Sequence, residues 1–73
     1  MNAKEIGQLI RATRKQLKLT QSELALTAGT ATRFISDLEN GKPTCQLERT
    51  LSVLRTLGLK ITITPNSTEL RHG

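Results

Sequence analysis

The stretch LTQSELALTAGTATRFISDLENGK, residues 19–42 of the 73-residue chain, decides the fold. Thr20 is followed three residues later by Glu23, and this spacing is a capping box that predicts a helix from residue 21 to about residue 28. Gly29 ends this helix, because glycine adopts the left-handed backbone of a helix C-terminus without strain. The first half of the stretch is therefore one short helix with a defined start and end.

A second short helix follows, from about residue 31 to residue 39, and Asn40-Gly41 ends it in the same way. Two helices joined by so short a turn must cross closely, and Ala25 is small enough to allow that crossing. The side chains expected to point inward are Leu24, Leu26, Ile35 and Leu38. Residues 20–39 therefore have the layout of a helix-turn-helix.

Further helices are predicted on both sides of this unit. Asn2 and Glu5 form another capping box, and apolar residues at helical spacing predict a helix over residues 3–18. Thr44 caps a fourth helix that ends near Leu57. The expected fold class is mainly α, with four helices.

Residues 59–64 change to period-two spacing, which predicts one C-terminal β-strand. Its apolar face consists of Leu59, Ile61 and Ile63. The sequence shows no second strand, and natural proteins usually cover an unpaired strand edge. The simplest partner is the same strand of a second copy, so these three residues are expected to join a homodimer. Residues 1–64 then form the domain and residues 65–73 a flexible tail.

The composition limits the classes of partner. Eleven Lys and Arg residues against six Asp and Glu residues give a net charge of +5, which favours a polyanionic partner. The chain has 36% hydrophobic and 23% charged residues, a balance typical of a folded domain. No apolar run is long enough for a membrane span or a signal peptide, so we expect a cytoplasmic, nucleoid-associated protein without membrane contact.

Catalysis is not expected, because few groups are available to converge on a site. The single His is His72, next to the C-terminus, and the single Cys is Cys45. These residues provide no metal ligand set, and no cofactor-binding motif is present. Cys45 falls in the first turn of the predicted fourth helix, where it is either a redox-sensitive thiol or an inert small side chain.

The sequence resembles the Cro/repressor-type helix-turn-helix family, also called the xenobiotic-response-element family, of bacterial and phage regulators. The opening LTQSELA and the close ISDLENGK carry the resemblance, which extends over residues 5–64. It implies a lambda-repressor-like fold in which Arg14 and Glu39 form an ion pair. We interpret that pair as one that holds the fold, in preference to a DNA contact. The single strand after the fourth helix is most similar to HipB-type antitoxins.

The helix over residues 31–39 is expected to enter the major groove of DNA. The residues predicted to read bases are Ala31, Thr32, Arg33, Ser36 and Asp37. Arg33 can donate to both O6 and N7 of a guanine. Asp37 would be repelled by phosphate, so it accepts from a cytosine amino group, orients Arg33, or remains solvated.

A second group of residues is expected to bind phosphates and set the register on the duplex. Its members are Thr20, Gln21, Lys42, Lys18, Lys15 and Arg11. Thr20 and Gln21 lie at a helix N-terminus, where free N–H groups and the helix dipole favour an anion. The resemblance implies that Gln21 and Lys42 contact the sugar-phosphate backbone of the DNA.

The leading hypothesis is a dimeric, sequence-specific repressor that binds an inverted-repeat operator. The HipB-like resemblance implies an antitoxin that represses its own operon and binds a HipA-like kinase toxin. One alternative is a protein–protein adaptor with the same fold that reads no DNA. Another is a phage or restriction-system regulator with no toxin partner.

Overall fold

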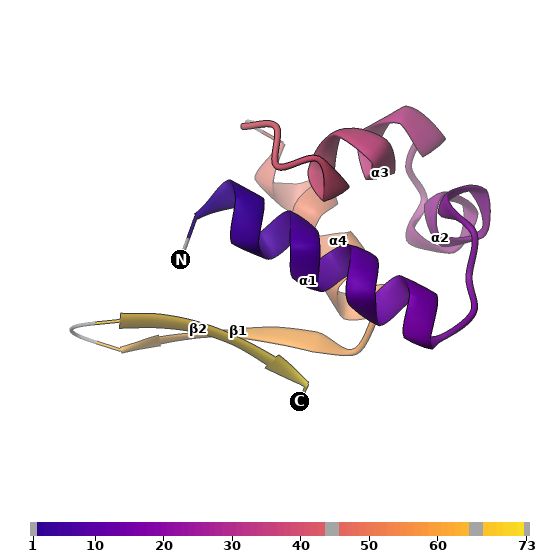
Figure 1. The fold of residues 1–73 in the computed structure, drawn as a ribbon. Helices are drawn as coiled ribbons and strands as arrows, with labels where there is room; N and C mark the ends of the chain where they lie inside the picture. Colours follow the sequence, from indigo (N-terminus) through magenta and orange to yellow (C-terminus); the bar gives the residue numbers. More distant parts are fainter. Residues whose placement is uncertain (1, 44–45, 65–66, 73) are drawn as a thin grey trace.

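The computed structural model describes residues 2–43, 46–64 and 67–72. Four helices are followed by a two-stranded hairpin (Figure 1): α1 (Ala3–Gln16), α2 (Gln21–Ala28), α3 (Thr32–Glu39), α4 (Leu47–Thr56), β1 (Leu59–Thr64) and β2 (Ser67–His72). The mainly α fold class expected from the sequence is confirmed. None of the helices among these described residues is long and apolar enough to cross a membrane.

Side-chain caps define where the first two helices begin. The Asn2 side chain accepts a hydrogen bond from the Glu5 backbone N–H at 2.9 Å at the start of α1. At the start of α2, Thr20 Oγ1 accepts from the Glu23 N–H at 3.0 Å, and the Thr20 N–H donates to Glu23 Oε1 at 2.8 Å. Gly29 ends α2 with φ +73°, the left-handed conformation expected of it.

The helices share one apolar core. Its buried members are Ile10, Leu24, Ala25, Ile35, Leu38, Val53, Leu54, Leu57 and Leu59. The prediction that Leu26 points inward was wrong, because its side chain is 84% exposed. Leu26 follows Leu24 by two positions, which is about 200° around a helix, so α2 cannot bury both. Leu24 and Ala25 occupy the core-facing side.

The close packing of α1 on α3 depends on Gly7. A Cβ at this position would collide with the backbone carbonyl oxygen of Leu38, in the last turn of α3. Gly7 is buried in the middle of α1, where glycine is otherwise unfavourable. The missing side chain therefore allows the two helix backbones to approach each other.

The C-terminal segment differs from the prediction. The strand over residues 59–64 forms as expected, but it pairs antiparallel with β2 of the same chain, with Ile61 opposite Leu70 and Lys60 opposite Arg71. The prediction that the chain supplies no partner strand was therefore wrong, and most of the expected tail is a strand. β2 contains Leu70 as its one strongly apolar residue, so it lacks the alternation by which an isolated strand is predicted.

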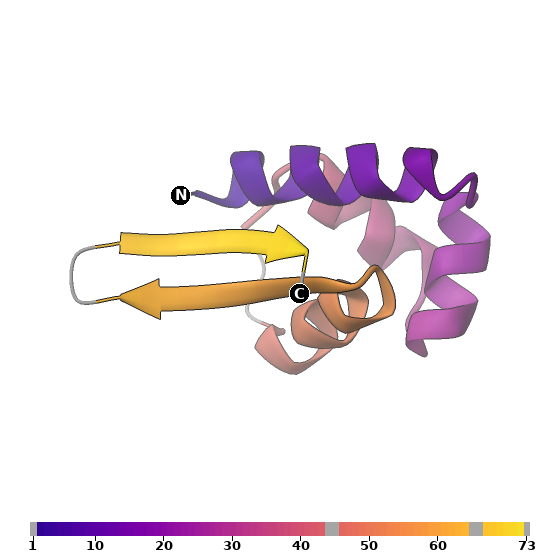
Figure 2. The same cartoon turned by 90° about the horizontal axis from the view of Figure 1, so that it is seen from below.

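The fourth helix is described from Leu47, with Gln46 as its N-cap residue. Thr44, which was expected to cap it, lies outside the described residues, as does Cys45 with the two alternatives suggested for it. The hairpin and α3 lie on opposite sides of the molecule. Viewed from below, the hairpin is in front and α3 is in the faint background (Figure 2). α1 and α4 therefore separate α3 from the hairpin.

Candidate nucleic-acid interface

The outer side of α3 carries the residues predicted to read bases. Ala31, Thr32 and Arg33 are exposed, and Ser36 and Asp37 are partly exposed. The opposite side of the helix is anchored in the core by Ile35 and Leu38, which are 0% and 5% exposed. All five predicted residues therefore lie on or next to the solvent-facing side of one short helix.

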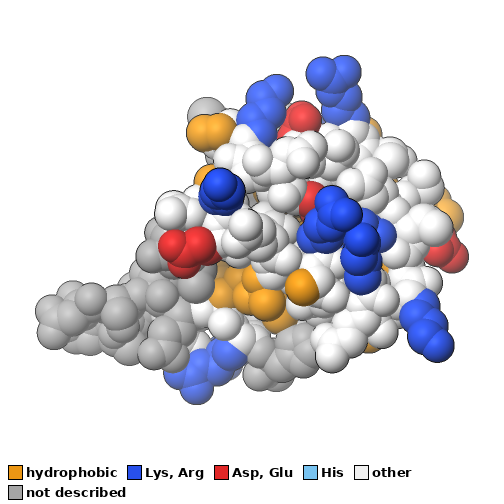
Figure 3. All heavy atoms as spheres, viewed as in Figure 1, with side chains coloured by type: hydrophobic (Ala, Val, Ile, Leu, Met, Phe, Trp, Pro, Cys, Tyr) orange, Lys and Arg blue, Asp and Glu red, His pale blue; other side chains and the backbone are white. Residues whose placement is uncertain are grey.

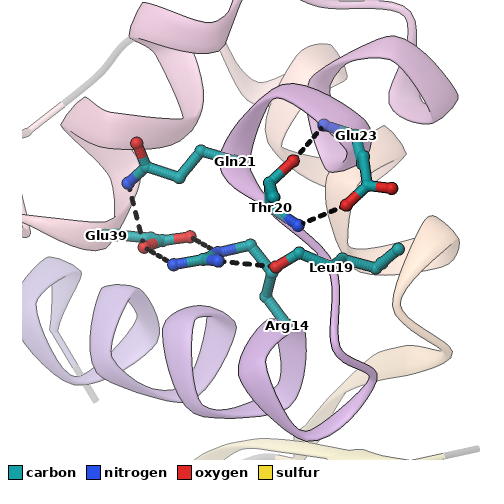
Figure 4. Close-up of polar contacts among 6 residues, drawn as sticks. All are labelled: Arg14, Leu19, Thr20, Gln21, Glu23 and Glu39. Carbon is teal, nitrogen blue, oxygen red and sulfur yellow. Dashed lines mark hydrogen bonds and ion pairs between the residues drawn. The ribbon is translucent and has the colours of Figure 1, made fainter.

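A buried ion pair joins the end of α3 to α1 (Figure 4). Arg14 Nε donates to Glu39 Oε2 at 2.6 Å, and the second terminal nitrogen of Arg14 donates to Oε1 at 3.0 Å. The remaining terminal nitrogen donates to the Leu19 carbonyl at 2.7 Å. The hydrogen bond to Glu39 raises the pKa of Arg14 above its usual value, against the opposing effect of burial. With every nitrogen occupied, Arg14 holds the helices together.

Gln21, a predicted phosphate contact, is connected to the same pair. Its Nε2 donates to Glu39 Oε1 at 3.2 Å from the start of α2 (Figure 4). One N–H of the amide is used in this bond, which leaves the second N–H as a donor. Gln21 is thus positioned by Glu39. One N–H of its amide holds the fold, and the other can donate to an acceptor outside the chain.

Thr20, another predicted phosphate contact, is engaged with Glu23 in the capping box. The hydrogen bonds from the Thr20 backbone and hydroxyl lower the pKa of Glu23, so its carboxylate stays charged beside the N-terminus of α2. A negative charge at this position opposes an incoming phosphate. The structure therefore places Thr20 at the expected helix end together with a carboxylate that weakens anion binding there.

Asp37 and Lys42 face each other across the end of α3. Lys42 Nζ lies 3.7 Å from Asp37 Oδ2, and the Lys42 backbone N–H donates to the Asp37 carbonyl at 3.0 Å. Among the alternatives for Asp37, orientation of Arg33 finds no support in this geometry, because its nearest cation is Lys42. The Lys42 side chain is 61% exposed, so it remains accessible to a phosphate.

The remaining predicted phosphate contacts come from α1 and the turn after it. Arg11, Lys15 and Lys18 are all exposed. Lys and Arg side chains lie over both α1 and α3 on the face shown in Figure 3. Lys18 has φ +61°, an unusual value for a residue other than glycine. It follows the C-terminal end of α1, which in Figure 1 lies at the lower right, away from α3.

Two short helices, α2 and α3, cross each other, and α3 has a polar outer side. The ion pair of Arg14 and Glu39 holds α1 against them. A family model described as a helix-turn-helix domain matches residues 7–63. The chain belongs to the helix-turn-helix family. The resemblance to helix-turn-helix proteins found in the sequence is thereby confirmed at the family level.

Two relatives of this helix-turn-helix chain are similar over most of its length. An HTH-type transcriptional regulator, y4mF, of Sinorhizobium fredii (strain NBRC 101917 / NGR234) is 54% identical over 59 residues, which is 81% of this chain and 78% of the relative. The ImmF control region 10 kDa protein of Bacillus phage phi105 is 32% identical over 63 residues, 84% of this chain and 70% of the relative.

The helix-turn-helix unit also contains contacts that the sequence reading missed. The Asp37–Lys42 contact spans the end of α3, and a cation just after a helix C-terminus was the available signal for it. Ser52 of α4 donates to the Ala28 carbonyl at 2.9 Å and so ties the end of α2 to α4. No local pattern predicts that tertiary bond. In the described part of the chain, no group of three or more His, Cys, Asp or Glu residues could hold a metal ion.

The residues expected to join two copies have another role in the structure. Leu59 is 5% exposed within the core of its own chain, and Ile61 packs against that core. The side chain of Ile63 is outside the described part of the structure. Leu59 and Ile61 therefore attach the hairpin to the helices, and the idea that their side chains form a dimer interface is corrected.

Proposed function

We propose that this chain is a sequence-specific DNA-binding transcriptional repressor that acts as a homodimer. The observation that carries the proposal is α3 itself, whose outer side presents exposed Thr32 and Arg33 while Ile35, Leu38 and Glu39 fix its inner side. A rigid helix with a polar outer side and a basic surrounding surface fits the major groove. The relative named as an HTH-type transcriptional regulator supports the regulatory role.

Base reading in this proposal centres on Arg33. Its guanidinium can donate to O6 and N7 of a guanine, a pairing that discriminates against other bases by about 1–3 kcal/mol. Thr32 and Ser36 donate or accept hydrogen bonds beside it. Asp37 accepts from a cytosine amino group once Lys42 has turned to a phosphate. Ala31, at the N-cap of α3, lets the helix approach the groove floor closely.

Phosphate contacts come from the residues around α3. Lys42 and Gln21 are the strongest, because both are held next to the ends of the two crossing helices. Arg11 and Lys15 add cations from α1, whereas Thr20 and Lys18 contribute least for the reasons given above. If each protomer neutralises about 3–5 phosphates, log K of the dimer falls with log salt with a slope of about −5 to −9.

The homodimer is proposed because an inverted-repeat operator requires two reading helices about 34 Å apart. A contact between two hairpins would use the backbone groups on the outer edges of β1 and β2, since Leu59 and Ile61 of β1 pack within their own chain. With Ile61→Ala as the control for the lost side chain, Ile61→Pro removes a backbone N–H on the outer edge of β1. The N–H of Thr62 points instead to β2, where Thr62 lies opposite Glu69. Sedimentation of the Ile61→Pro variant, its control and the parent protein tests the strand contact: an unchanged dimer would exclude the β1 edge.

We further propose an antitoxin role, in which the repressor regulates its own operon and binds a HipA-like kinase toxin. The support for this role is the resemblance to HipB-type antitoxins, which rests on the strand that follows the fourth helix; a strand lies at that place, β1. A phage-type regulator without a toxin is the second candidate, favoured by the phage relative named after a control region. Co-purification with the product of the adjacent gene separates the two roles. A stable complex of the two proteins supports the antitoxin role, and the absence of a complex supports the phage-type role.

The experiment that tests the DNA-binding function is selection of random duplexes on the purified protein at one fixed salt concentration. The proposal predicts an enriched inverted repeat, and it predicts that Arg33→Ala loses the preference at one base pair in each half-site. Arg49→Ala, an exposed Arg on α4, serves as the matched control. If the duplexes selected on the parent protein show no enriched sequence, the proposed function is contradicted.

A further inference from the structure

We propose that Lys4, in the first turn of α1, binds a phosphate of the DNA backbone next to the phosphate contact of Lys42. The inference rests on the DNA-binding function proposed above, and it adds a residue of α1 outside the set predicted from the sequence. The observation that carries it is a close approach of two backbones, because a Cβ at Gly41 would lie 2.8 Å from the Cα of Lys4. Lys4 itself is exposed.

The packing at Gly41 brings the two lysines close together. Gly41 directly precedes Lys42, and a Cβ at Gly41 would also lie 3.2 Å from the Cβ of Lys4. A C–C bond is about 1.5 Å long and consecutive Cα atoms are about 3.8 Å apart, so the Cα atoms of Lys4 and Lys42 lie within about 8 Å of each other. Because each ammonium group is carried on a flexible four-carbon chain, both can reach the same stretch of DNA backbone.

The charges at the end of α3 favour a second cation there. The Lys42 ammonium lies 3.7 Å from the Asp37 carboxylate, which offsets part of its charge. The C-terminus of a helix also carries partial negative charge, and this opposes a phosphate. Lys4 forms no ion pair with any residue that the structure describes. Its ammonium therefore supplies the uncompensated positive charge that a phosphate contact needs at this place.

Lys4 lies on the flank of α1 beside α3. Gly7 and Arg14 are the residues of α1 that meet the end of α3. At about 100° per residue, Lys4 and Arg11 share one side of α1, which is turned by about 60° from the side of Gly7 and Arg14. Lys and Arg side chains lie over α1 and α3 on the face shown in Figure 3. Since Arg11 is a proposed phosphate contact, Lys4 extends the same basic stripe toward the N-terminal end of α1.

A role in the fold alone is the competing explanation. A cation beside a helix C-terminus stabilises that helix, and Lys4 lies beside the turn that follows α3. The same cation stands in the first turn of α1, where the positive end of the helix dipole disfavours it. These opposing effects predict a small net contribution of Lys4 to stability, whereas a phosphate contact predicts a clear loss of DNA affinity on its removal.

The test compares Lys4→Gln with Lys60→Gln, which makes the same change of charge on the hairpin, on the side of the molecule away from α3. Fluorescence anisotropy measures the affinity for the selected duplex and for a scrambled duplex over a range of salt concentrations. Lys4→Gln is expected to weaken binding to both duplexes by the same factor and to reduce the slope of log K against log salt by about 1 per protomer. Lys4→Arg and Lys60→Gln are expected to keep the slope of the parent protein.

The outcomes separate this inference from the function on which it rests. If the parent protein binds neither duplex even at low salt, the proposed function and the inference are both overturned. If the parent binds DNA and Lys4→Gln keeps its slope, the inference alone is overturned, and a lower melting temperature of that variant would then assign Lys4 to the fold. An equal reduction of the slope in Lys60→Gln would assign the effect to net charge and reject the contact.

Discussion

The carboxylate of Glu39 and the guanidinium of Arg14 meet at 2.6 Å although the two residues are 25 positions apart in the chain. Their side chains are 2% and 9% exposed, so the pair is shielded from solvent. It connects α1 to the last residue of α3, and Gln21 extends the connection to α2. The orientation of α3 therefore depends on a polar contact beside the apolar core.

Removing one member of this pair is expected to destabilise the fold strongly. Glu39→Leu leaves the buried guanidinium of Arg14 without its counter-charge, and such losses cost about 3–5 kcal/mol. The double variant Arg14→Met/Glu39→Leu leaves no buried charge and should recover most of that loss. Urea denaturation of the three proteins measures the difference. A double variant as unstable as the single variant would show that the pair contributes more than charge compensation.

Lys18→Gly is expected to stabilise the protein. Lys18 has φ +61°, a conformation that is costly for a side chain with a Cβ and free of strain for glycine. The expected gain in the free energy of unfolding is up to about 1 kcal/mol, measured by thermal or urea denaturation. Lys18→Ala, which removes the charge and keeps the Cβ, is the control and should show no such gain. A gain of the same size in both variants would assign the effect to charge.

Asp37→Asn is expected to change how the protein discriminates between sequences. The substitution removes a negative charge that repels phosphate and that pairs with Lys42 at 3.7 Å. Affinity for a scrambled duplex should rise, and the ratio of specific to non-specific affinity should fall. Fluorescence anisotropy with the selected and scrambled duplexes at the same salt concentration measures both quantities. An unchanged ratio would mean that Asp37 is a solvated residue without a reading role.

Stability is expected to fall in acid in part through Glu23. Hydrogen bonds from Thr20 lower the pKa of Glu23 in the folded protein below the ordinary value of 4.5. A carboxyl whose pKa is lower in the folded state than in the unfolded state stabilises the folded protein at pH values above the unfolded pKa. This stabilisation is lost as the pH falls from the unfolded pKa through the folded pKa. The Glu23→Gln variant should therefore lose less stability than the parent protein between neutral pH and the acid range. Identical pH profiles for the two proteins would contradict this role of the capping box.

The elements predicted correctly are those whose signals are local. The Asn2 cap, the capping box at Thr20 and the left-handed Gly29 each depend on contacts within a few residues, so the starts of α1 and α2 were predicted well. Of the capping box expected at Asn2, the structure shows the bond from the Glu5 N–H to the Asn2 side chain. The period-two pattern defined β1 from Leu59 to Thr64 with the observed limits.

The parts that were missed depend on contacts between distant segments. β2 carries little alternation of its own and forms because β1 offers an edge, so its existence is a tertiary property. The exposure of Leu26 was missed because Leu24 and Leu26 are both apolar, and composition alone does not show which of the two faces the core. The need for glycine at position 7 becomes visible only when the end of α3 is placed against α1.

The central claim is that the outer side of α3 reads base pairs, and the most direct measurement is the affinity of Arg33 variants for the selected duplex and for a scrambled duplex. Arg33→Ala is expected to weaken binding to the selected duplex by about 1–3 kcal/mol and to leave binding to the scrambled duplex nearly unchanged. Arg33→Lys keeps the charge and should lose most of the same discrimination, because an ammonium lacks the planar pair of donors. If Arg33→Ala weakens both duplexes equally, or neither, α3 does not read sequence through this residue.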